Sequence, residues 1–154
     1  MKITALLLLA FIAGCSADIQ KDIKQEKQEN LIKKSYEEYQ LVLLDIHNKE
    51  RQKHSISNLE LNEDLCRYAQ EHAKEMATKG KIYHSNISNL KKFGSTVFGE
   101  NVACGQKTEK SVVDAWLWSP MHRWNIMGKS YKKVGFGLAS GNEGENYWCV
   151  VFTN

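Results

Sequence analysis

The sequence contains little proline and little cysteine, the residues that are abundant in collagen-like and in disulfide-built proteins, respectively. It has one proline and four cysteines in 154 residues, and four cysteines are too few for a fold built on disulfide bonds. The near-average composition, 42% hydrophobic and 25% charged, excludes a disordered, collagen-like or multi-spanning membrane chain. A formal net charge of +3 gives no reason to expect a nucleic-acid partner. The length suits one globular domain with a tail.

The chain also lacks a hydrophobic run long enough to cross a membrane. Its one marked run, residues 3–13, is broken only by Thr4 and is shorter than the roughly 20 apolar residues that a transmembrane helix needs. One basic residue, Lys2, precedes this run and small residues follow it, which is typical of a secretory signal peptide. The alternative interpretation is a buried N-terminal helix.

Residues 12–15, Ile-Ala-Gly-Cys, resemble the lipobox of bacterial lipoproteins. The resemblance implies that residues 1–14 form a lipoprotein signal peptide and that Cys15 is lipidated and becomes the mature N-terminus. Because two or more acyl chains anchor a protein stably, we expect an extracytoplasmic protein held at the bacterial cell envelope. Ser16, rather than aspartate, follows the cysteine and favours the outer membrane if the host is Gram-negative.

Residues 15–35 are predicted to form a charged spacer. They are rich in Lys, Gln, Glu and Asp and contain no glycine or proline. Such a segment buries too little apolar area to fold alone, so we expect it to be solvated and partly helical. A basic membrane-binding stripe is the alternative, and the acids among the lysines argue against it. The remaining residues, 36–154, are predicted to form the folded domain.

Helical periodicity predicts three helices in this domain. Asn62 suits the N-cap of the second helix and Gly80 suits its end. Pro120 closes the third helix, because the residue before a proline avoids helical backbone angles. The helices are expected from residue 36 to near residues 51–54, from 62 to 80, and from 108 or 109 to 119.

Two strands are predicted at the C-terminus, over residues 134–139 and 147–153, with a turn between them. Residues 81–105 show no clear helical period and carry Asn, Ser and Gly throughout, so we predict a long irregular segment that builds a site. Helices followed by strands indicate an α+β fold, in which helices pack on a small, mainly antiparallel sheet.

Three of the five histidines are expected to be structural or merely exposed. His47 and Arg51 lie one helical turn apart, which suits a clamp between the first helix and the loops. His72 lies close to the apolar face of the second helix and is expected to be partly buried. His54 lies in a loop beside lysines and is expected to be exposed.

His84 and His122 differ from these three because both lie in serine-rich stretches that are predicted to be non-helical. Glu100 lies between them in the sequence, directly after a glycine of the irregular segment. Two imidazoles and a carboxylate brought together would make an open metal site. The same three groups could instead form a general acid–base constellation.

Read in order, these residues resemble the signature of the CAP superfamily, or SCP domain, which contains cysteine-rich secretory proteins, antigen 5 and pathogenesis-related 1 proteins. The resemblance covers about residues 37–154 and ends in an aromatic strand. The pattern Ser-Pro-x-His-Arg-x-Asn-Ile resembles the bacterial branch. The matching pieces are His47-Asn48 with Arg51, residues 61–77, Tyr83-His84-Ser85, residues 99–103, residues 113–116, residues 119–126 and residues 134–137.

The resemblance implies an α-β-α sandwich with a central cleft, in which two histidines and two acidic residues bind a divalent metal, often zinc. His84, Glu100 and His122 match three of these four positions. Ser119 occupies the neighbourhood where many eukaryotic members carry the second acid, and no acid lies between residues 114 and 143. A missing carboxylate would weaken or reshape a metal site.

Two functions follow from this interpretation. The first is a lipid-anchored binding module whose cleft takes a divalent metal, a lipid or another extracytoplasmic ligand. The second is a metal-assisted hydrolase, protease-like or directed at the cell wall, in which His84 and His122 hold the metal, Glu100 is the base and Ser119 replaces the second acid. The incomplete set of four favours binding over catalysis.

The remaining cysteines, Cys66, Cys104 and Cys149, leave two interpretations open. An oxidising compartment permits one disulfide among them, with one thiol left over. All three could equally be free and buried as small apolar residues.

Overall fold

The computed structural model describes residues 4–154, with side chains described for residues 19–28, 31 and 38–154. Part of the predicted lipoprotein signal, residues 1–3, therefore lies outside the described residues, and the Cys15 side chain lies outside the described side chains. The chain divides into two compact units, Met1–Glu38 and Tyr39–Asn154.

Helix α1, Thr4–Gln52, begins well before the helix that the periodicity predicted from residue 36. The prediction began too late because residues 15–35 carry no apolar face, yet they contain no glycine or proline that would interrupt a helix. The described side chains of this stretch, residues 19–28 and 31, are exposed. Within the described residues, no helix combines the length and hydropathy needed to cross a membrane.

A four-stranded mixed sheet forms the middle of the second unit, with strand order β1-β3-β4-β2. The predicted C-terminal strand pair is confirmed as β3, Lys133–Ser140, and β4, Asn146–Thr153, which are antiparallel. The short β1, Glu60–Leu61, runs parallel to β3, and β2, Phe98–Cys104, runs antiparallel to β4.

The prediction of an irregular segment over residues 81–105 was wrong at both β2 and a 3₁₀ helix, η1, Ile87–Phe93. Five consecutive residues of β2, 99–103, are buried. A strand covered on both faces shows no alternation of polar and apolar residues, and that alternation is what identifies a strand in a sequence.

Helix α2, Glu63–Lys79, covers one face of the sheet and has the predicted caps. The Asn62 side chain accepts a hydrogen bond from the Leu65 amide, and Gly80 takes the left-handed conformation with φ 59°. The helix approaches β3 closely at Gly135 and Gly137, where an added Cβ would overlap the backbone of Leu65 or Ala69.

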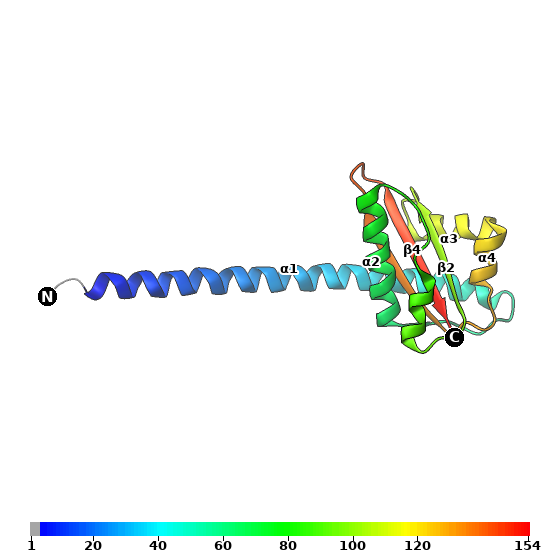
Figure 1. Cartoon of the computed structure of the whole chain (residues 1–154), viewed down its shortest axis with the longest axis horizontal. Coiled ribbons are helices and arrows are strands. Elements are labelled where there is room, and N and C mark those ends of the chain that lie inside the picture. Colours follow the sequence, from blue (N-terminus) through cyan, green and yellow to red (C-terminus); the bar gives the residue numbers. More distant parts are fainter. Residues whose placement is uncertain (1–3) are drawn as a thin grey trace. The chain divides into compact units, whose positions relative to one another are not determined.

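The other face of the sheet carries the end of α1 together with α3, Glu109–Trp118. Phe136 lies between the two glycines that face α2, so its side chain points to this opposite face. There the His47 ring lies 5.0 Å from the Phe136 ring and 6.1 Å from the Trp116 ring, between centroids. Figure 1 shows α2 and α3 on opposite sides of the sheet. The predicted α+β fold, an α-β-α sandwich, is confirmed.

Pro120 ends one helix and begins another. Ser119 takes extended angles, φ −89° and ψ 119°, as predicted, and α3 stops there. Proline is also well tolerated at the first position of a helix, and here it starts α4, Pro120–Ile126. His122 is therefore helical, and the prediction of a non-helical context was wrong.

The predicted clamp at the end of α1 is confirmed. His47 and Arg51 are fully buried, and His47 Nδ1 lies 2.8 Å from the Leu43 carbonyl oxygen. The Arg51 guanidinium donates to four backbone carbonyl oxygens, those of Ser57 (2.8 Å), Ile126 (2.8 Å), Gly128 (3.0 Å) and Tyr131 (3.2 Å). Arg51 thereby fastens the segment before β1 and the segment before β3 to the end of α1.

The other two structural histidines also lie as predicted. His72 is buried, with Nε2 2.8 Å from the Tyr83 carbonyl oxygen, and His54 is exposed. The three cysteines with described side chains, Cys66, Cys104 and Cys149, are free thiols, so the disulfide alternative is wrong for this structure.

Candidate ligand site at the edge of the sheet

Glu100 is the centre of the candidate site. It lies on β2, at the edge of the sheet, and its side chain is 2% exposed. Its Oε1 lies 2.7 Å from His84 Nδ1 and accepts a hydrogen bond from the Ser85 amide at 2.9 Å. The Ser85 hydroxyl donates to Oε2. The structure therefore brings together two of the predicted site residues, His84 and Glu100.

This contact defines which tautomer a neutral His84 ring has. A ring nitrogen that faces a carboxylate carries the proton, so neutral His84 has Nδ1–H and an unprotonated Nε2. The His84 side chain is 62% exposed, in contrast to its buried partner. Glu100 therefore fixes the orientation of an exposed imidazole whose second nitrogen has a lone pair for a ligand.

Two further groups, which the sequence did not indicate, support Glu100. The Tyr68 hydroxyl donates to Ser85 Oγ at 2.9 Å, and Ser85 in turn donates to Glu100. The Cys149 thiol lies 3.9 Å from Glu100 Oε2, and burial, followed by the Glu100 charge, raises the pKa of this thiol well above its ordinary value. Cys149 is thus a protonated donor to Glu100 near neutral pH.

The backbone of His122 lies against the same strand on the opposite face of the sheet. Asn101 follows Glu100 on β2, so its side chain points to the side of α4. Its Nδ2 donates to the His122 carbonyl oxygen at 3.0 Å. Asn125 donates to Asn101 Oδ1 at 2.8 Å and to the Glu100 carbonyl oxygen at 3.0 Å. These amide bonds hold α4 against β2.

The surroundings of His122 favour its neutral imidazole. Burial is the main cause that lowers the pKa of His122, and the electrostatic effect of His84 lowers it further. Gly99 leaves the space that α4 needs, because a Cβ there would lie 2.5 Å from Tyr131 Oη and 2.8 Å from Asn125 Oδ1.

Glu100 was predicted as the third metal ligand, and Ser119 was expected in the place of the missing acid. Both oxygens of Glu100 already accept hydrogen bonds from His84 and Ser85. In the part of the chain with described side chains, no group of three or more His, Cys, Asp or Glu residues is arranged to hold a metal ion. Ser119 lies between α3 and α4, and its side chain makes no capping bond to α4.

A pocket of about 350 Å³ lies beside His84 on the α2 side. Its lining is mostly polar, and it shares Tyr68 and Ser85 with the network around Glu100. This pocket gives a ligand access to the candidate site. It is lined by Tyr68, Glu71, His72, Glu75, Tyr83, His84, Ser85, Asn86 and Asn89.

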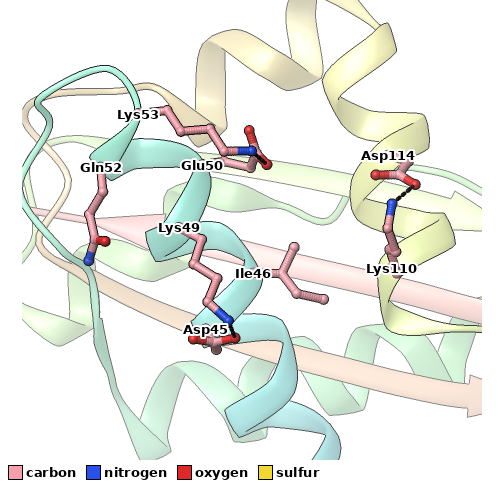
Figure 2. Close-up of a pocket in the computed structure, with 8 residues that line it drawn as sticks. All are labelled: Asp45, Ile46, Lys49, Glu50, Gln52, Lys53, Lys110 and Asp114. Carbon is pink, nitrogen blue, oxygen red and sulfur yellow. Dashed lines mark hydrogen bonds and ion pairs between the residues drawn. The ribbon is translucent and has the colours of Figure 1, made fainter.

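A second pocket, of about 460 Å³, lies between α1 and α3 (Figure 2). Its charges are already neutralised by neighbours on the same helix, as Figure 2 shows for Lys49 with Asp45, at 2.7 Å, and Lys110 with Asp114, at 2.6 Å. It contains none of the predicted site residues, so we place the candidate site at β2.

The sandwich and its mixed sheet are those of an SCP domain. The chain belongs to the cysteine-rich secretory protein family, CAP, whose profile matches residues 44–152. It is 33% identical over 122 residues to YkwD of Bacillus subtilis, covering 74% of this chain and 46% of YkwD. It is 30% identical over 122 residues to human Golgi-associated plant pathogenesis-related protein 1, covering 68% of this chain and 75% of the human protein. The chain thus spans about half the length of YkwD.

Solved structures share the fold. An outer surface protein from Borrelia burgdorferi aligns with a TM-score of 0.67 and 22% identity, over 73% of this chain and 90% of the Borrelia protein. An extracellular protein from Bacillus anthracis that contains an SCP domain aligns with a TM-score of 0.68 and 19% identity, over 77% of this chain and 41% of that protein.

Proposed function

We propose that this CAP domain is an extracytoplasmic binding module and that His84 and His122 hold a divalent metal, such as zinc, at the edge of β2. The observation that carries the proposal is the 2.7 Å contact between Glu100 Oε1 and His84 Nδ1. Histidines that bind metals usually donate their other ring N–H to a carboxylate or carbonyl, which fixes the tautomer and orients the ring.

The donor groups fit a metal with two protein ligands, His84 and His122. Glu100 would support them through its hydrogen bond with His84. Neutral imidazoles suit zinc, and water or ligand groups would complete its coordination. Glu100 would orient His84 rather than bind the metal, since both its oxygens already accept hydrogen bonds. A general base must accept a proton from water. Because both Glu100 oxygens already accept hydrogen bonds from His84 and Ser85, we favour binding over the hydrolase alternative.

Calorimetric titration of the full chain with zinc near neutral pH tests the proposal. We expect the double substitution His84→Ala and His122→Ala to abolish binding, and Glu100→Gln to weaken it about 10- to 100-fold through the loss of His84 orientation. His54→Ala is the matched control, because His54 is exposed outside the site. Equal zinc affinity in the wild type and the double variant overturns the proposal.

We also propose that the chain is anchored through a lipid at Cys15. The lipobox-like residues 12–15 support this, and the relatives and structural neighbours include a secreted protein, an extracellular protein and an outer surface protein. Metabolic labelling with palmitate should label the wild type and the control Cys104→Ser, but not Cys15→Ala. Label that persists in Cys15→Ala contradicts lipidation at this residue.

A further inference from the structure

The junction of α3 and α4 exposes three large apolar side chains. Trp118 is 88% exposed, Met121 75% and Trp124 68%, whereas no other large apolar side chain in the described residues exceeds 57%. Met121 and Trp124 are three residues apart in α4 and share one side of the helix. We call Trp118, Met121 and Trp124 the aromatic face. Large apolar side chains that are exposed so close together in the chain are a candidate interaction site.

The sequence around the aromatic face is basic and contains no acid. From Asp114 to Glu143 the chain has four cations and no carboxylate side chain between them. All four are exposed, and among the described side chains none forms an ion pair with an acid. Other lysines of the domain do form such pairs. The four cations are Arg123, Lys129, Lys132 and Lys133.

We propose that the aromatic face docks the domain on an anionic lipid surface, with Arg123 and Lys129 contacting the headgroups. Tryptophan favours the boundary between water and acyl chains, because its ring is largely apolar and its N–H is polar. Exposed cations add attraction to anionic headgroups. A protein partner could also cover an aromatic patch, but cations without any acid match a surface of uniform negative charge. This docking surface goes beyond the proposed metal site, since none of its members belongs to the Glu100 network.

Quenching of tryptophan fluorescence by brominated lipid tests the proposal directly. The other two tryptophans, Trp116 and Trp148, are each 1% exposed and lie in the core, so the exposed pair reports contact with lipid. The full chain is mixed with vesicles of brominated phosphatidylcholine, with or without phosphatidylglycerol. We expect quenching in the vesicles that contain phosphatidylglycerol, and we expect added salt to reduce it.

Charge reversal separates this docking from any insertion by the N-terminal segment. Each cation near an anionic surface contributes about a fivefold factor, and a glutamate in its place is repelled. The double variant Arg123→Glu and Lys129→Glu should therefore lower lipid contact by at least about 25-fold while keeping both tryptophans. Lys81→Glu with Lys107→Glu is the matched control, because both lysines are exposed elsewhere and the net charge changes equally. Equal quenching in both kinds of vesicle, no quenching in either, or equal loss in both double variants overturns the proposal and leaves the aromatic face to a protein partner.

Discussion

Arg51 shows how one residue can organise several loops without an acidic partner. It is fully buried, burial lowers its pKa, and its partners are carbonyl oxygens of the backbone. A planar guanidinium donates in several fixed directions, which the single ammonium of lysine cannot do.

We therefore expect Arg51→Lys to lower the free energy of unfolding by about 2–4 kcal/mol, because buried carbonyls lose their donors. Urea denaturation measures this change. The control is Arg67→Lys, since Arg67 pairs with Asp64 on the exposed side of α2 and such pairs contribute less than about 1 kcal/mol. Similar losses in the two variants would contradict the role of Arg51.

His47 makes the stability of the domain depend on pH. Its Nε2 is buried without a hydrogen-bond partner, and burial is the main cause that lowers the His47 pKa from 6.5 to about 4. Between these two pH values the unfolded chain binds a proton that the folded domain does not. The contribution of His47 to stability is therefore constant above pH 6.5 and falls as the pH drops toward 4, by about 3 kcal/mol in total.

Urea denaturation at several pH values measures this loss. We expect His47→Gln to have a shallower decline in unfolding free energy between pH 6.5 and 4 than the wild type, because glutamine does not take up a proton there. The exposed His54 supplies the control, and His54→Gln should follow the wild type. An unchanged slope in His47→Gln would show that this residue is not responsible.

At the scale of the elements, the close contact between α2 and β3 depends on two glycines of β3, Gly135 and Gly137, which have no side chain. At Gly137 an added Cβ would overlap the Ala69 carbonyl group of α2. We expect Gly137→Ala to lower the free energy of unfolding by about 1–3 kcal/mol or more, because helix and sheet must separate. Chemical denaturation measures the loss. Gly80→Ala controls for backbone freedom, since Gly80 has φ 59° and open space around it, and should cost about 1 kcal/mol. A smaller loss at Gly137 than at Gly80 would contradict the close approach.

The elements also show where the sequence was informative. Asn62, Gly80 and Pro120 act through local geometry, so α2 and the end of α3 were predicted nearly to the residue. The strand β2 was missed because its burial comes from elements on both faces, and α4 because the same proline that ends α3 also starts a helix.

At the scale of the molecule, the second unit has its own core and should fold without the residues before it. Its helix α1 begins there with Tyr39 and Gln40, whose side chains both donate to the Phe136 carbonyl oxygen. We expect a chain that starts at residue 36 to have a melting temperature within about 4 °C of the full chain, equivalent to less than roughly 1 kcal/mol. Scanning calorimetry of both chains tests this. A chain that starts at residue 45 loses the fully buried Leu43 and should unfold at a much lower temperature.

The sequence alone predicted the family, the α+β class and the structural role of Arg51, and it proposed His84, Glu100 and His122 as site residues. These follow from residue types in a fixed order and from local rules of helix capping. The tertiary structure decided which roles these residues have. Only the pairing of β2 at the sheet edge turns Glu100 toward His84 and Ser85, and its neighbour Asn101 toward α4, because successive side chains of a strand point to opposite faces.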